Sequence, residues 1–188
     1  MSLTSDDIAL ERDIANLGMD RPEVTEPTVR RLAARGPAAV PALLAALAED
    51  RLGGAGRGLV LRLLGRLALP ETFPAVASAV RDPRYIAKLA ALTAVASFDL
   101  PEATATLTSA LSDPDPDIVR EGAYLLLRRA DSSAIPALVC LLEHPNPSCR
   151  VAAARALWAL GGSEAQAALN LRRRSESDHD VLRALNGT

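Results

Sequence analysis

Few residues of this chain have the type and spacing that catalysis or metal binding requires. The 188 residues include two histidines, His144 and His179, and two cysteines, Cys140 and Cys149. Neither histidine lies in a His-Glu-x-x-His motif, and the cysteines do not form a Cys-x-x-Cys pair, so zinc or iron lacks ligands at workable spacing. We therefore expect no catalytic residue, no metal and no cofactor, and we interpret both cysteines as reduced core thiols.

Carboxylates recur along the chain, each 6 or 7 residues before a cation. A catalytic carboxylate pair would occur once, in an environment that shifts its pKa. Recurrence at near-constant intervals indicates instead a structural part of a repeated unit, and in the next copy His144 replaces the carboxylate. The pairs are Asp50 with Arg57, Asp82 with Lys88, and Asp113 with Arg120.

Two neighbouring segments of the chain are nearly the same in sequence. Ala-Thr-Ala-Thr-Leu at 103–107 corresponds to Ala-Ile-Pro-Ala-Leu at 134–138, and Asp-Pro-Asp-Pro at 113–116 corresponds to His-Pro-Asn-Pro at 144–147. Self-similarity at a period of 31 residues indicates a repeat array. In each copy an apolar segment leads through a proline-containing turn to a longer segment with helical periodicity.

These patterns predict an all-α chain of antiparallel helix hairpins. The composition agrees, because hydrophobic residues make up 49% of the chain while aromatics make up 3%, and Ala and Leu favour helix. One hairpin cannot cover its own apolar face, so it must stack on its neighbours. We predict one domain over 1–188 with about six hairpins, at 5–36, 37–69, 71–98, 101–130, 132–161 and 163–186.

The repeated motifs resemble HEAT repeats. The resemblance rests on Ala-x-Pro-Ala-Leu at 134–138, Asp-Pro-Asp-Pro at 113–116 and Val-Arg-x-x-Ala at 119–123. The short spacing is similar to the HEAT-like repeats of phycobilin (PBS) lyases. The resemblance implies a right-handed α-solenoid, an α-α superhelix, in which Asp50, Asp82 and Asp113 form a structural ladder with the cations across neighbouring turns.

In a solenoid of this kind the second helix of each hairpin lines the concave side. Residues at i, i+4 and i+8 lie on one helical face, and aromatic and Arg side chains dominate binding energy at interfaces. Trp158 can also pack in the seam against the last hairpin, and both interpretations stay open, as they do for Tyr124. The candidate partner-binding residues on this face are Arg57, Lys88, Arg120, Tyr124, Arg128, Arg150 and Trp158.

A glycine cluster at 53–58 has the look of a phosphate-binding loop. Gly53, Gly54, Gly56 and Gly58 belong to it, but the Gly-Lys-Ser/Thr ending is missing and no strand precedes it. We interpret the cluster as a flexible or tightly packed turn between helices.

The charge balance argues against a nucleic-acid or membrane partner. The formal net charge is −2, so no global field attracts polyanions. No targeting segment or membrane-spanning run is visible, and we expect a cytoplasmic protein that is a monomer or a weak homodimer.

We expect a non-enzymatic scaffold or adaptor that binds a protein or peptide along the concave face. The first alternative is a chromophore-binding protein like the phycobilin lyases. The second is a HEAT-like DNA-binding protein of the glycosylase type, for which the block 51–100, with 7 cations and 3 anions, is the basic region. The HEAT-repeat hydroxylases are disfavoured, because their paired His-Glu motifs have no counterpart here.

Overall fold

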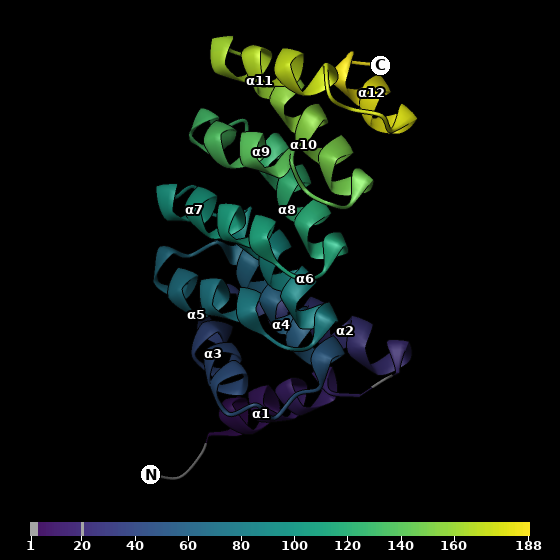
Figure 1. Ribbon diagram of the computed structural model, residues 1–188. Coiled ribbons are helices and arrows are strands. Elements are labelled where there is room, and N and C mark those ends of the chain that lie inside the picture. Colours follow the sequence, from purple (N-terminus) through teal and green to yellow (C-terminus); the bar gives the residue numbers. More distant parts are fainter. Residues whose placement is uncertain (1–3, 20) are drawn as a thin grey trace. The chain divides into compact units, whose positions relative to one another are not determined.

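The computed structural model describes residues 4–19 and 21–188, and every regular element in these ranges is a helix (Figure 1). No strand occurs among the described residues. The prediction of an all-α chain built from repeated helices is therefore confirmed.

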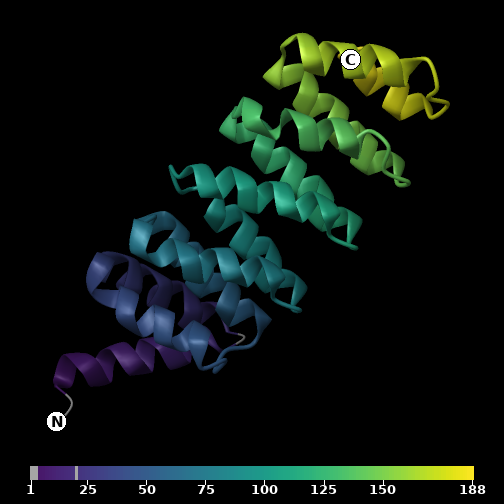
Figure 2. The ribbon, with the colours of Figure 1, turned by 60° about the vertical axis from the view of Figure 1, so that its left-hand side comes forward.

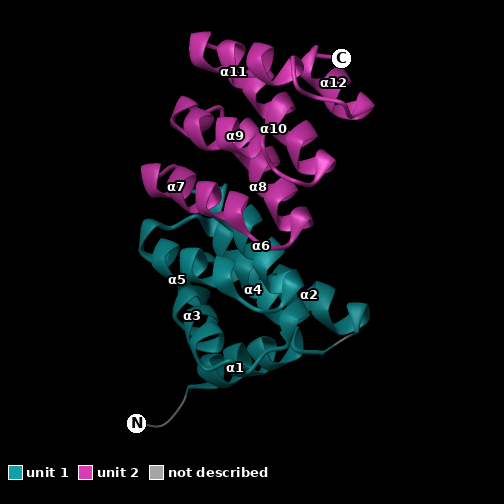
Figure 3. Ribbon diagram, in the orientation of Figure 1, with its two compact units in different colours: residues 1–98 teal, residues 99–188 magenta. Residues whose placement is uncertain are grey.

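The chain divides into two compact units, residues 1–98 and residues 99–188 (Figure 3). Each unit has its own apolar core, formed mainly by Leu and Ala side chains. The single domain over 1–188 stays a prediction.

Unit 1 contains three hairpins, and short 3₁₀ turns extend several of its first helices. The second helices α4 and α6 pack along each other. The elements of this unit are α1 (Ser5–Leu17), α2 (Pro22–Arg35), η1 (Gly36–Ala39), α3 (Val40–Ala48), α4 (Gly54–Leu67), η2 (Pro70–Thr72), α5 (Phe73–Ser78), η3 (Ala79–Arg81) and α6 (Tyr85–Val95).

Unit 2 also contains three hairpins. Its first helices α7, α9 and α11 follow one another, as do its second helices α8, α10 and α12, and Figure 2 shows the same order from another side. The elements are α7 (Pro101–Ser109), η4 (Ala110–Ser112), α8 (Pro116–Arg129), η5 (Ser132–Ala134), α9 (Ile135–Leu141), α10 (Pro147–Leu160), α11 (Ser163–Arg173) and α12 (His179–Leu185).

The glycine cluster of unit 1 lies largely within a helix. Helix α4 begins at Gly54, so Gly56 and Gly58 belong to its first two turns, and the prediction of an inter-helix turn is wrong there. A Cβ on Gly56 would lie 2.8 Å from the carbonyl oxygen of Leu17. The tight packing that we expected is present, since the absence of side chains lets α4 approach its neighbours closely.

Candidate functional site

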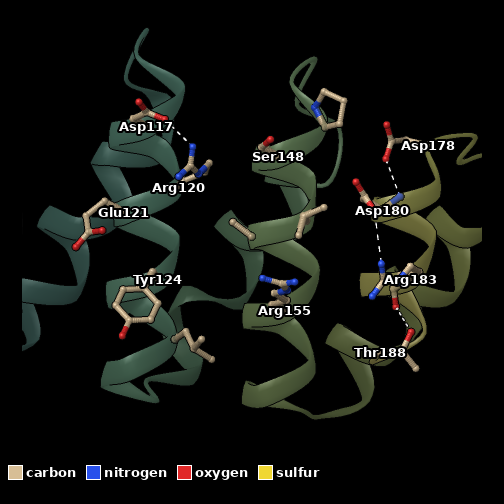
Figure 4. Close-up of a pocket in the computed structure, with 14 residues that line it drawn as sticks. Asp117, Arg120, Glu121, Tyr124, Ser148, Arg155, Asp178, Asp180, Arg183 and Thr188 are labelled. Atoms are coloured by element: carbon tan, nitrogen blue, oxygen red, sulfur yellow. Dashed lines mark hydrogen bonds and ion pairs between the residues drawn. The ribbon is translucent and has the colours of Figure 1, made fainter.

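A groove of about 800 Å³ crosses the second helices of unit 2 (Figure 4). We call it the unit 2 groove. Its lining residues come from α8, α10, α12 and the segments on either side of α12, and its side chains are a mixture of charged, polar and apolar groups. They are Asp117, Arg120, Glu121, Tyr124, Leu127, Pro147, Ser148, Val151, Ala152, Arg155, Asp178, Asp180, Arg183 and Thr188.

Side-chain caps determine where the three groove helices begin. The carboxylate of Asp115 accepts the amide N–H of residue 117, and the amide oxygen of Asn146 accepts that of residue 148. Pro116 and Pro147 each follow the cap at the first helical position, where the missing N–H has no cost. Asp178 caps α12 in the same way. The short motifs of the turns thus place the first turns of the three helices at the upper end of the groove in Figure 4.

Charged groups at both edges of the groove are paired with each other. On α8 the guanidinium of Arg120 lies 2.6 Å from the carboxylate of Asp117. On α12 the guanidinium of Arg183 lies 3.8 Å from the carboxylate of Asp180. Exposed pairs of this kind contribute little to stability, so a ligand can replace either partner at small cost.

Other polar groups on α8 and α10 line the groove and have no partner among the described residues. These are the carboxylate of Glu121, the hydroxyl of Tyr124 and the guanidinium of Arg155. Figure 4 shows Glu121 and Tyr124 on one helix and Arg155 on the next. Tyr124 is 50% exposed, and the guanidinium of Arg128 lies 5.9 Å from the centre of its ring. The groove therefore offers an aromatic face, a cation and an anion to a ligand.

A buried ion-pair network fixes the turn that leads into α12. Both Nε and Nη2 of Arg150 donate to the carboxylate of Glu176, at 2.9 and 3.0 Å, and Arg172 donates to the same group. The hydrogen bonds from Arg150, together with those from Arg172 and two backbone amides, lower the pKa of Glu176 from 4.5 to about 2. The Glu176 side chain is 1% exposed and that of Arg150 is 11% exposed, so this network lies away from the ligand-accessible surface.

The corresponding network in unit 1 is built around Arg57. Its Nε donates to Asp82 at 2.8 Å, and its Nη1 donates to Asp50 at 3.0 Å and to the carbonyl oxygen of Leu47 at 2.8 Å. Arg84 also pairs with both carboxylates. Although burial opposes it, hydrogen bonds from the Arg84 amide and from Arg57 lower the pKa of Asp82.

The structure brings together some of the residues that the sequence marked for binding. Arg120 and Tyr124 line the unit 2 groove, and Arg128 lies over the Tyr124 ring. Arg57 and Arg150 are each 11% exposed and held by carboxylates, and neither lies in the groove. The binding roles of these residues stay predictions.

The remaining predicted residues lie elsewhere. Lys88 is half-buried on α6, and Asp113, in the turn before α8, accepts the amide N–H of Asp115 at 2.9 Å. Trp158 does not line the groove. It is 38% exposed, its indole N–H donates to the carbonyl oxygen of Leu185, and its ring lies against Gly187. Both interpretations of Trp158 thus capture part of its environment.

Three residues that shape these sites were missed in the sequence. Arg155 lies 31 residues after Tyr124, and Glu176 lies 32 residues after His144, so the repeat period could have identified both. His144 itself accepts the amide N–H of Asn146 through Nδ1, as Asp113 accepts that of residue 115. The imidazole therefore performs the turn-forming role of the carboxylate that it replaces. Glu121 carries no comparable signal.

Neither metal ligation nor a membrane span is seen in the part of the chain that is described. No group of three or more His, Cys, Asp or Glu side chains there could hold a metal ion. No described helix has the length and apolarity that crossing a bilayer requires.

Two family models match the chain. The model for HEAT repeats matches residues 40–128, and the model for armadillo/beta-catenin-like repeats matches residues 130–160. No curated protein matches the chain in sequence.

Several solved structures resemble the chain over 95% of its length. One is an engineered protein, at 20% identity, a TM-score of 0.52 and 94% coverage of that chain. Another is the complex of CpcE and CpcF of phycocyanin lyase from Nostoc sp. PCC7120, at 19% identity, a TM-score of 0.50 and 96% coverage. Human deoxyhypusine hydroxylase in complex with glycerol matches at 18% identity, a TM-score of 0.48 and 82% coverage. Similarity at this level of identity shows the fold alone, because one fold hosts many activities.

Proposed function

We propose that this chain is a non-enzymatic scaffold. It matches HEAT repeats over residues 40–128 and an armadillo-type repeat over residues 130–160. It binds a peptide segment of a partner protein in the unit 2 groove. Tyr124 and Arg155 provide the central contacts, with Glu121, Arg120 and Arg128 around them.

The observation that carries this proposal is the groove itself, with unpaired polar groups on α8 and α10. Its volume of about 800 Å³ is in the upper part of the range for small-ligand pockets, about 300–1,000 Å³. Because it runs across three helices, it can hold several consecutive residues of an extended chain. A peptide also supplies both a donor for Glu121 and an acceptor for Arg155.

The chemistry of the lining supports binding over catalysis. Neither histidine nor cysteine lines the groove. Asp117 and Asp180 are paired with arginines, and Asp178 caps a helix, so three of the four groove carboxylates already have structural partners. Aromatic and Arg side chains are the residue types that provide most of the binding energy at protein interfaces.

The proposal gives the buried arginines a structural role. Arg57 and Arg150 hold the segments between helices together and bind no partner directly, because both are largely buried and already donate to carboxylates and carbonyl oxygens. Trp158 holds the end of α12, a helix that lines the groove, by donating to the carbonyl oxygen of Leu185.

The test compares proteins captured by two variants of the whole chain. Tyr124→Ala with Arg155→Glu removes the main proposed contacts, whereas Leu171→Ala with Arg174→Glu makes comparable changes at two exposed positions, one on α11 and one at its C-cap. We expect quantitative mass spectrometry to find partners lost by the groove variant and retained by the control. Peptides that tile such a partner should then include one whose affinity falls at least about tenfold in the groove variant. Equal capture by both variants would contradict the proposal.

A further inference from the structure

Unit 1 exposes three arginines on neighbouring second helices. Arg30 lies on α2, and Arg62 and Arg66 lie on α4. All three are exposed, and their guanidinium groups have no hydrogen bond or ion pair with any described residue. We call this surface the arginine face.

The three positions belong to one surface. Arg30 and Leu59 line the same hollow of about 390 Å³ between α2 and α4, together with Thr25, Glu26 and Val29. Arg62 follows Leu59 by three residues, and Arg66 follows Arg62 by four. Residues three and four apart are neighbours on a helix surface, so the cations continue from the hollow along α4.

Five other arginines of this unit are held in ion pairs. Arg31 donates to Asp13, Arg35 to Asp6, and Arg51 to Glu11. Arg57 and Arg84 share Asp50 and Asp82. One carboxylate, that of Glu26, lines the hollow beside Arg30, and it forms no ion pair with it. An excess of unbalanced positive charge therefore remains on the arginine face.

We propose that the arginine face binds an acidic peptide segment that inserts one apolar side chain into the hollow. Arg presents a planar set of donors that matches a carboxylate, and Arg62 and Arg66 are spaced to contact successive acidic side chains. Val29 and Leu59 give the hollow apolar walls. The partner is therefore a protein segment that combines Asp or Glu with a residue such as Leu.

Nucleic acid fits this surface less well. Affinity for DNA grows with the number of phosphates neutralised, and strong binding involves about 6–10 contacts. The face provides three cations, and residues 1–98 carry 12 Lys and Arg against 11 Asp and Glu. An apolar hollow contributes nothing to a phosphate backbone, whereas it suits a peptide.

The experiment uses the full chain and a fluorescein-labelled peptide of repeating Glu-Asp-Leu-Glu units. We expect saturable binding in fluorescence polarisation, with amide shift changes confined to α2 and α4 in NMR spectra. Arg62→Glu with Arg66→Glu should weaken binding at least about tenfold. The matched control is Arg12→Glu with Arg81→Glu, two exposed arginines outside these helices, and it should change binding less than about twofold.

Three results would overturn the inference. One is the absence of binding up to about 1 mM peptide, the weak limit of specific association. Another is equal binding by the folded Arg62→Glu, Arg66→Glu variant, with folding checked by circular dichroism. The third is tighter binding of a single-stranded oligonucleotide of equal charge, which would assign the face to nucleic acid. Binding should persist in the Tyr124→Ala, Arg155→Glu variant, so the outcome does not depend on the unit 2 groove.

Discussion

The buried networks of the two units follow the same plan, while their exposed faces differ. Arg57 in unit 1 and Arg150 in unit 2 each reach a carboxylate in the next turn, 25 and 26 residues further on, at Asp82 and Glu176. Each also donates to carbonyl oxygens shortly before its own helix, that of Leu47 at the end of α3 for Arg57 and those of His144 and Pro145 for Arg150. Repeat geometry thus constrains these arginines in both units.

The exposed positions of the second helices have no such constraint. In unit 1 they carry unpaired cations, and in unit 2 they form a groove of mixed charge. The difference indicates that packing determines the buried half of each repeat and that partner choice resides in the exposed half. The following predictions test this division.

The largest effect is expected for Glu176→Gln. This change leaves two largely buried guanidinium groups, those of Arg150 and Arg172, without their shared carboxylate. Breaking a buried pair costs about 3–5 kcal/mol, and we expect about 3 kcal/mol here. Urea unfolding followed by Trp158 fluorescence measures it within unit 2. Glu164→Gln, an exposed position on α11, is the control, and a loss equal to that of the control would show that the network is not stabilising.

The same network should make unit 2 sensitive to acid. The pKa of Glu176 is about 2 in the folded chain and 4.5 in the reference state, so its contribution is complete above pH 4.5 and is lost as the pH falls towards 2. The contribution is at most about 3 kcal/mol. The difference in unfolding free energy between the wild type and Glu176→Gln should therefore shrink from pH 6 to about pH 2. A difference that stays constant over this range would contradict the assignment.

Arg57→Ala and Arg150→Ala should have smaller and similar effects. In each case the buried carboxylate keeps a second arginine, Arg84 beside Asp82 or Arg172 beside Glu176. We expect about 2 kcal/mol for each, below the full cost of an unpaired buried charge. Circular dichroism during urea unfolding measures both. A much larger loss for one variant would show that the two networks are not equivalent.

The hairpins and their caps could be predicted from the sequence because they depend on local signals. The 31-residue period and the Asp-Pro or Asn-Pro turns determine where helices such as α8 and α10 begin.

The binding face was harder to predict because of helix geometry. Each residue turns a helix by about 100°, so a line in steps of four from Arg150 starts about 200° around α10 from Ser148. It passes through the buried Ala154 to Trp158 and does not reach the groove residues. The groove instead follows Ser148, Val151, Ala152 and Arg155, at alternating steps of three, one and three.

The close approach of neighbouring helices at glycine positions also could not be predicted from the composition. Nothing in the residue types shows that Gly65 faces a neighbouring backbone, yet a Cβ there would lie 2.7 Å from Ala94. Likewise the repeat interval after His144 marks the position of Glu176, but it does not show that both Arg150 and Arg172 donate to this carboxylate. Contacts between repeats depend on side-chain direction, which the spacing of motifs does not determine.

Trp158→Phe should lower the unfolding free energy moderately, because Trp158 holds the end of α12. The substitution keeps a ring against Gly187 but removes the indole N–H that donates to Leu185. Loss of one such hydrogen bond costs about 1 kcal/mol. Circular dichroism gives the stability, since the variant has no Trp. A loss of about 3 kcal/mol or more would show instead that Trp158 is mainly a core residue.

The smallest effect on stability, with the largest on binding, is expected for Tyr124→Ala. The ring is half exposed, its hydroxyl has no partner among the described residues, and its one specific contact is the Arg128 guanidinium over its face. An exposed cation–π contact contributes about 0.5–1 kcal/mol, so unfolding free energy should fall by no more than that. Binding of the unit 2 partner should weaken by about tenfold or more, because aromatic anchors at the centre of an interface carry much of its energy. Tyr124→Phe keeps the ring and separates its contribution from that of the hydroxyl. If Tyr124→Ala destabilised the chain as strongly as Arg150→Ala, the residue would belong to the packed half of the repeat, and the division between buried and exposed positions would fail at its central example.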